Sequence, residues 1–306
     1  MRILTRLLLV FITLGNSLES DACDVCGGSG NIQGLGLLPQ FSSHLAGIQY
    51  LYSSSASDHP SLFADKPNEV SAQSVTTLQL WGKYKLSKRF QLFAFLPYVY
   101  NNNTDGTQSL RSKGFGDASV IANISIPLAE NNSNKRLLLA GAGLKLPTGK
   151  YVPVKDASQY VLPNTQAGSG SWDIIGNVNY TVKAAKWGYN IDATYLLTTT
   201  NEYQYKFGNR CNISGTAFYS IGQKNLKMLP QCGIRLEYSL HDYDNYEKKW
   251  LNEQTGGTMS FISAGAQFFY KKLGLKSIVY IPAYQNYAVG YVHTNTRFET
   301  GIFILF

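Results

Sequence analysis

The sequence predicts an all-β protein, an antiparallel transmembrane β-barrel of about 12 strands in the bacterial outer membrane. Three observations support this. Only 15% of the 306 residues are charged, whereas roughly a quarter are charged in soluble proteins. Segments of alternating apolar and polar residues recur from residue 41 to the C-terminus. Short and long connections alternate between these segments, as periplasmic turns and outer loops do in such barrels.

Residues 1–20 have the features of an export signal peptide. Arg2 and Arg6 provide a positively charged start, an apolar run spans residues 7–14, and small or polar residues follow it. The run is much shorter than the roughly 20 residues of a membrane-spanning helix. We therefore expect the mature chain to be exported and to enter a membrane only as strands.

Residues 21–40 form a Gly-rich segment that precedes the first predicted strand and contains Cys23 and Cys26. A CxxC pair can bind a metal, exchange thiols or form a small disulfide, and the disulfide is the default in an oxidising periplasm. Asp21 disfavours lipid attachment at Cys23. The segment is long enough to enter the barrel, so we hypothesise that it plugs the lumen. The other interpretation leaves it in the periplasm, where it would contact a partner.

Residues 41–306 carry the predicted barrel, with its two kinds of connection. Short connections are predicted at residues 86–88, 129–134, 184–186, 223–225 and 271–272. Long connections are predicted at residues 53–70, 101–113, 151–168, 200–205 and 241–256. An even number of strands returns the C-terminus to the side on which the first strand begins.

The predicted strands alternate with a period of two, which a soluble β-sandwich would also show. In residues 189–197, Tyr189, Ile191, Ala193 and Tyr195 share one face, opposite Asn190, Asp192 and Thr194. Two further features favour a membrane. Tyr and Trp residues fall near predicted strand ends, where amphipathic rings suit the interface. The last strand ends at Phe306, so we expect outer-membrane lipid around the barrel and recognition of Phe306 by the barrel-assembly machinery.

Three motifs on successive predicted strands resemble a known family. They are Gly114-Phe115-Gly116-Asp117, Gly143-Leu144-Lys145-Leu146-Pro147-Thr148-Gly149-Lys150 and Gly168-Ser169-Gly170-Ser171-Trp172-Asp173. In this order they are similar to the outer-membrane barrels named as transporters of the meta-pathway of phenol degradation. The N-terminal CxxC segment resembles the Bacteroidetes-type branch of that family. The resemblance implies a channel for the passive uptake of small hydrophobic or aromatic solutes.

Charged side chains on the predicted inner face form the candidate solute path. A hairpin that turns near Asn132 makes Asp117 and Lys145 diagonal neighbours, and Asp173 projects from the next strand. The candidate residues are Asp117, Lys145, Asp173, Asp192, Arg210, Arg235 and Glu237, with Arg297 and Glu299 on the same face. Two interpretations stay open. The charges form either a constriction that selects solutes or an internal salt-bridge network that stiffens a narrow barrel.

Other classes of function have less support. The His residues stand in no nucleophile motif, so we expect neither an enzyme nor a cofactor. Cys211 and Cys232 fall out of register on neighbouring strands, which disfavours a disulfide. Lys and Arg form no basic run despite the net charge of +8, which argues against nucleic-acid binding. The alternative to a channel is a closed structural or assembly barrel that works with a periplasmic partner through the CxxC segment.

Overall fold

The computed structural model describes nine parts of the chain. They are residues 35–37, 43–59, 69–105, 108–126, 128, 134–151, 163–223, 225–245 and 248–306. The predicted signal peptide, Cys23, Cys26 and most of the 21–40 segment lie outside the described residues. In the parts described, no helix is long and apolar enough to span a membrane.

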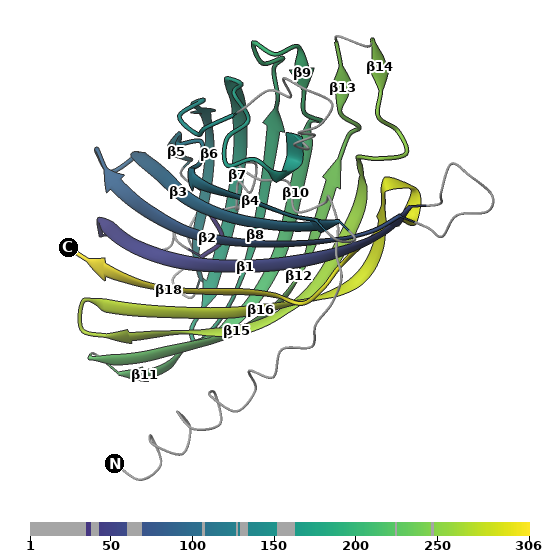
Figure 1. The fold of residues 1–306 in the computed structure, drawn as a ribbon. Helices are drawn as coiled ribbons and strands as arrows, with labels where there is room; N and C mark the ends of the chain where they lie inside the picture. The colour runs from purple at the N-terminus through teal and green to yellow at the C-terminus, as the bar shows by residue number, and fades with distance from the viewer. Residues whose placement is uncertain are drawn as a thin grey trace.

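The described strands form a closed antiparallel barrel of 12 wall strands (Figure 1). In chain order the wall consists of β1 (Leu45–His59), β2 (Glu69–Lys85), β3 (Phe90–Asp105), β4 (Gln108–Phe115) continued by β5 (Ser119–Ile126), β6 (Asn134–Lys145), β7 (Asp173–Ala184), β8 (Trp187–Leu197), β10 (Arg210–Tyr219) continued by β11 (Ile221–Gln223), β12 (Leu226–Ser239), β15 (Gly257–Tyr270), β16 (Leu273–Tyr287), and β17 (Val292–Thr294) continued by β18 (Arg297–Leu305). The ring closes because β1 pairs with β2 on one side and with β17 and β18 on the other.

One end of the barrel carries short turns and the C-terminus, and the other carries longer connections. By the rule for such barrels, the short-turn end is periplasmic. Above the other end stands a small sheet of β9 (Tyr205–Lys206), β13 (Tyr243–Asp244) and β14 (Lys249–Trp250) (Figure 1). The remaining described elements are the 3-10 turns η2 (Pro163–Thr165) and η3 (Ala288–Gly290).

The alternating sequence pattern places apolar side chains outside and mostly polar ones inside. Outward-facing residues that stay exposed include Ile48, Leu80, Val120, Leu144, Ile174, Ile191, Ile234 and Ile302, with Tyr84, Trp172, Trp187, Tyr238 and Tyr270 near strand ends. Such a continuous apolar surface with flanking rings is the lipid-facing band of a transmembrane barrel. The protein is therefore an integral barrel of the outer membrane.

Two predicted long connections are wrong in extent, because strands occupy half of one and nearly all of the other. β1 and β2 extend through much of residues 53–70, and β3 and β4 cover nearly all of residues 101–113. Ser and Asn are common in turns, which favoured loops there. In the structure, alternate members of these runs face the lumen, where a barrel accepts polar side chains. The buried ones are Ser53, Ser55, Ser57, Asn101 and Asn103.

The wall strand made of β4 and β5 is interrupted between its two parts. Between β4 and β5 lie Gly116, Asp117 and Ala118, and the N–H of Gly116 donates to the carbonyl of Pro97 at 2.8 Å. β5 pairs with β3 and β6, whereas β4 pairs with β3. The residues that follow β6 lie next to the gap between β4 and β5 and continue the wall there.

Candidate functional site

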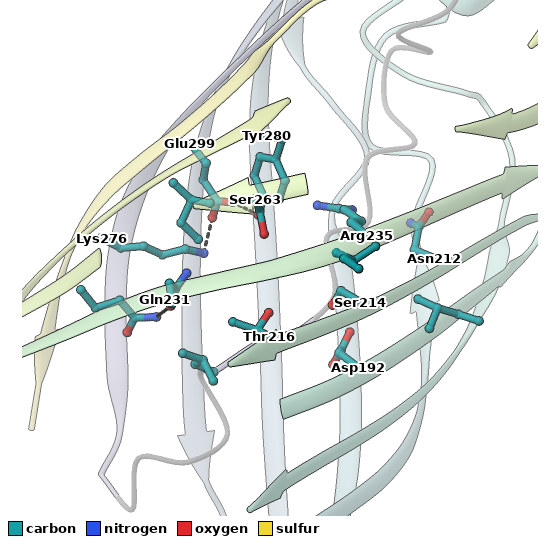
Figure 2. A pocket seen from close by; sticks show the side chains of 16 residues that line it. Asp192, Asn212, Ser214, Thr216, Gln231, Arg235, Ser263, Lys276, Tyr280 and Glu299 are labelled. Atoms are coloured by element: carbon teal, nitrogen blue, oxygen red, sulfur yellow. Dashed lines mark hydrogen bonds and ion pairs between the residues drawn. The ribbon is translucent and has the colours of Figure 1, made fainter. Parts of the chain in front are cut away.

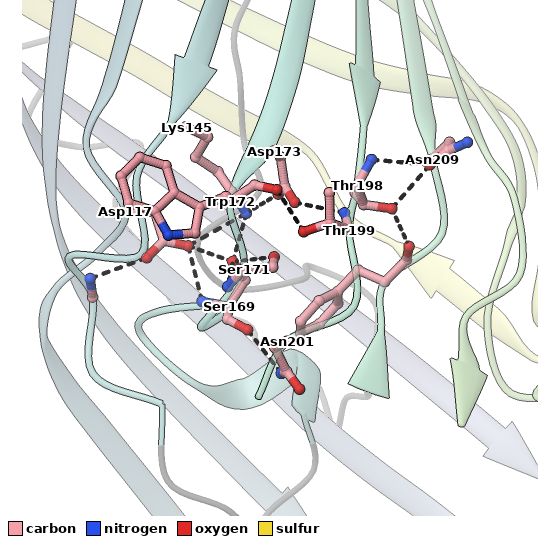
Figure 3. A network of polar contacts seen from close by, with 12 residues as sticks. Asp117, Lys145, Ser169, Ser171, Trp172, Asp173, Thr198, Thr199, Asn201 and Asn209 are labelled. Carbon is pink, nitrogen blue, oxygen red and sulfur yellow. Dashed lines mark hydrogen bonds and ion pairs between the residues drawn. The ribbon is translucent and has the colours of Figure 1, made fainter. Parts of the chain in front are cut away.

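The three sequence motifs converge on one buried polar cluster next to the interrupted strand (Figure 3). The Nζ atom of Lys145 forms ion pairs with Asp117, at 3.3 Å, and with Asp173. It also donates to the Oγ atom of Ser169 at 2.6 Å. Asp117, Lys145 and Asp173 are each at most 3% exposed. One motif thus supplies the cation of the cluster, and the other two supply its carboxylates.

Strand register explains how the cluster forms. Ser119 lies opposite Lys145, as the predicted hairpin requires, and Lys145 lies opposite Asp173. Backbone groups complete the coordination, since the N–H groups of Gly149 and Ser169 donate to Asp117 at 3.0 and 2.9 Å.

Gly149 and Gly168 let two chain segments approach closely within this cluster. A Cβ atom built on Gly149 would lie 2.6 Å from the Cα atom of Gly168. These contacts fit the interpretation of Asp117, Lys145 and Asp173 as an internal salt-bridge network. Their part in a solute path stays a prediction.

Residues 163–171 cross the inside of the barrel at the loop end, and we call them the outer strap. At one side, Ala167 packs against Val75 and Val99 on the inner faces of β2 and β3. Nearby, Ser112 donates its hydroxyl to the carbonyl of Thr165 at 2.5 Å. The strap is therefore attached to the wall at β2, β3 and β4.

At its other side the strap is attached to the connection between β12 and β15 through Asp242. The Asn164 side chain donates to the Oδ2 atom of Asp242 at 3.3 Å. The hydroxyl of Tyr205 and the N–H of Gly208 also donate to this carboxylate, both at 2.6 Å. Burial raises the pKa of the Asp242 carboxyl above its ordinary value. Three outer connections thus meet at one buried acid.

The raised pKa predicts a pH dependence of the strap. A carboxyl whose pKa is higher in the closed arrangement stabilises that arrangement below its ordinary pKa, and this contribution is lost as the pH rises through the raised pKa. Hydrogen exchange of residues 163–171 should therefore speed up more towards neutral pH in the wild type than in Asp242→Asn, which cannot titrate. Equal pH trends in the two proteins would contradict this role of Asp242.

A second group of charges lies on the wall formed by β12, β16 and β18. Glu237 accepts from Arg235 at 2.9 Å and from Arg297 at 2.8 Å. Lys276 forms an ion pair with Glu299, which also accepts from the hydroxyl of Tyr280 at 2.9 Å. The predicted residues Arg235 and Glu237 thus belong to a network different from that of Lys145.

Asp192 and Arg210 complete the set of predicted residues. Asp192, on β8, is 1% exposed and accepts from the side chain of Asn179 at 2.6 Å. Asn177 and Thr194 also contact this carboxylate. Arg210 begins β10 and is partly buried. The neutral amides around Asp192 were not among the candidate site residues predicted from the sequence, although they lie on the same polar face of β7.

The sequence prediction also missed an apolar zone inside the short-turn end, which we call the aromatic collar. Its inward-facing rings are Trp81, Phe93, Phe95, Phe218, Phe269 and Phe303. The Phe303 ring lies across Gly274 on the neighbouring strand, where a Cβ atom would stand 2.3 Å from the ring. The signal was present in the sequence, because each of these rings falls in the inward phase of its strand.

Residues 35–37 of the N-terminal segment lie inside this collar. Leu35 and Leu37 are 1% and 4% exposed and belong to the same apolar cluster as the collar rings. Between them, the carbonyl of Gly36 accepts from the Asn179 side chain at 2.9 Å. This part of the segment therefore contacts both the apolar and the polar lining of the lumen.

In the described part of the lumen, two of the cavities are small, with volumes of about 60 and about 30 Å³. Both are lined by Arg235, Tyr280 and Glu299, which Figure 2 shows around the larger one, and Leu37 also lines the larger one. Cys211 and Cys232 lie on neighbouring strands, opposite Tyr238 and Ala217. The two residues are thus out of register, as expected from the sequence, and neither is in a disulfide within the described part of the chain.

Comparisons with known proteins place the fold. Residues 66–232 match the model of a family described as "Putative MetA-pathway of phenol degradation". An outer membrane channel from Pseudomonas putida F1 is similar with a TM-score of 0.59 and 16% identity, over 86% of this chain and 96% of that one. The β domain of the Bordetella autotransporter BrkA is similar with a TM-score of 0.50 and 10% identity, over 87% and 100%. No curated protein matches the sequence.

Proposed function

This chain belongs to the family described as "Putative MetA-pathway of phenol degradation", and we propose that it forms an outer-membrane channel for the passive uptake of small hydrophobic or aromatic solutes. The observation that carries the proposal is the aromatic collar inside the lumen. A barrel interior is ordinarily polar. Aromatic rings on the lumen face of the wall therefore contact an apolar ligand more favourably than they contact water.

The lining changes along the barrel in a way that fits passage of such solutes. In the middle of the barrel, amides, hydroxyls and paired charges such as Arg235 with Glu237 line the lumen, whereas smaller apolar clusters lie near the loop end. Towards the short-turn end the lining becomes apolar at the collar. A solute with an aromatic body would leave the polar zone and enter an environment that matches it, driven only by its concentration gradient.

Residues 35–37 support a closed resting state. Leu35 and Leu37 occupy the space between the collar rings that a solute would cross. We propose that the N-terminal segment is a plug whose withdrawal opens the lumen, and that the outer strap narrows the opposite end. In this scheme Asp117, Lys145 and Asp173 hold the strap to the wall, while Asp192, Arg210, Arg235 and Glu237 line the path.

The proposal predicts selective flux through the purified barrel. Vesicles that contain lipopolysaccharide and the protein should take up small aromatic solutes faster than protein-free vesicles do. For polar solutes of similar size, such as glucose, the protein should add much less. Uptake of radiolabelled solutes measures both rates. Equal acceleration of both classes would rule out selectivity for aromatic solutes.

The alternative is a closed structural or assembly barrel that contacts a periplasmic partner through the CxxC segment. The observation in its favour is the extent of internal charge pairing around cavities as small as about 30 Å³. No flux from protein shown to be folded would support this alternative over a channel. In both cases we propose that the barrel-assembly machinery recognises Phe306, whose backbone pairs with that of His44.

A further inference from the structure

The larger lumen cavity, of about 60 Å³, has features of a binding site (Figure 2). Inward-facing residues of β8, β10, β12, β15, β16 and β18 line one side of it. Gly36 and Leu37 of the N-terminal segment line the other side. The cavity therefore lies at the contact between the wall and the proposed plug.

The charges around this cavity compensate one another. Lys276 is paired with Glu299, and Arg235 with Glu237. Asp192 accepts hydrogen bonds from Asn177 and Asn179, and electrostatic attraction to Arg235 offsets its charge. A charged solute would lose its hydration here without gaining a free counter-charge, which is costly in a buried site. The cavity therefore favours a neutral ligand.

The polar side chains that remain available to hydrogen-bond a ligand in the cavity are neutral. Gln267 is 2% exposed, and its Nε2 atom donates to Gln231 at 3.2 Å, but its Oε1 atom has no hydrogen-bond partner among the described residues. The side chains of Thr216 and Ser263 flank Gly233, since both residues lie opposite it in the sheet. Gly233 has no side chain to cover their hydroxyls, and all three polar side chains line the cavity.

A buried carbonyl oxygen without a donor costs free energy, so a native structure normally supplies one. The missing partner of Gln267 is thus a hydrogen-bond donor, and nearby hydroxyls can donate or accept. On the opposite side, Leu37 offers an apolar contact. The combination suits a molecule with one hydroxyl and an apolar body.

We propose that this cavity is a solute-binding site for small neutral molecules that combine a hydroxyl group with an apolar ring. The ligand hydroxyl donates to the Oε1 atom of Gln267, Thr216 and Ser263 line the polar side, and the ring displaces Leu37. Ligand and plug therefore compete for one space. The inference rests on the proposed channel function and deepens it, because it adds a binding site along the solute path through the lumen and specifies the class of solute.

Equilibrium binding tests the site separately from transport. Isothermal titration of the full-length barrel in nanodiscs would use benzyl alcohol, toluene and benzoate, which share a ring but differ in hydroxyl and charge. We expect benzyl alcohol to bind most tightly, and Gln267→Met to weaken it about fivefold, the effect of one hydrogen bond. Deletion of residues 21–40 should tighten binding, because Leu37 no longer competes.

The matched control is Gln91→Met, which removes another buried amide that does not line the cavity and whose Oε1 atom is likewise unpartnered in the described structure. Equal weakening by both substitutions would overturn the site, as would toluene or benzoate binding as tightly as benzyl alcohol. Absence of benzyl alcohol binding in both the full chain and the deletion would also overturn it. Binding that depends on Gln267 in a barrel that conducts nothing would keep the site and reject the channel.

Discussion

Lys145→Met should be the most destabilising single substitution in the wall, lowering the free energy of unfolding by about 3–5 kcal/mol. The substitution keeps the length of the side chain but leaves the carboxylates of Asp117 and Asp173 buried without their cation. Urea unfolding followed by tryptophan fluorescence measures the loss. A lower yield of folded barrel should accompany it, because the cluster joins three chain segments.

Lys150→Met is the matched control, because Lys150 lies in the same motif but is exposed. We expect a change within about 0.5 kcal/mol there, as for most surface substitutions. Adding Asp117→Asn to Lys145→Met should recover part of the stability by removing one uncompensated charge. A loss for Lys145→Met no larger than that of the control would contradict a structural network at this site.

Leu35→Asp combined with Leu37→Asp should raise solute flux at least about tenfold. Both side chains are buried among the collar rings, and an ionised carboxylate in such a place is strongly disfavoured. The segment would therefore leave the collar while the wall stays intact. Uptake of a small aromatic solute into vesicles, normalised to folded protein, measures the effect.

The control for this prediction replaces both residues by Ile, which keeps the segment apolar. Flux should then stay near that of the wild type, because Ile has the same volume as Leu. If the Asp and Ile proteins conduct equally, residues 35–37 do not close the lumen.

Local patterns were sufficient to predict the barrel and one part of its lining. A period of two places Asp117, Lys145 and Asp173 on one face, and hairpin register brings them together, so both steps follow from neighbouring strands. The confirmed pair of Ser119 with Lys145 shows that the register was readable from the sequence. The prediction succeeded where it needed only strands adjacent in the sequence.

The features that narrow the lumen depend on contacts that no local pattern contains. Asn164 and Asp242 meet although 78 residues separate them, and Leu37 reaches a cluster that includes Phe303. The rings of the collar were also assigned no role, because an inward-facing ring departs from the polar lumen that the fold leads one to expect. Composition also led to a wrong prediction of loops. Ser55 and Asn101 lie in runs of residues that are common in turns, but both belong to strands.

In the proposed mechanism, solute passes through the lumen only when residues 35–37 leave it. A reversible lock tests this most directly, with Leu37→Cys and Thr216→Cys placed on opposite sides of one cavity and the four native Cys replaced. Aromatic solute uptake into vesicles would be compared before and after reduction, with the disulfide verified by mass spectrometry. We expect background uptake for the oxidised barrel and rapid uptake after reduction. Equal uptake in both forms would contradict this mechanism, because the solute would then pass while the segment stays in place.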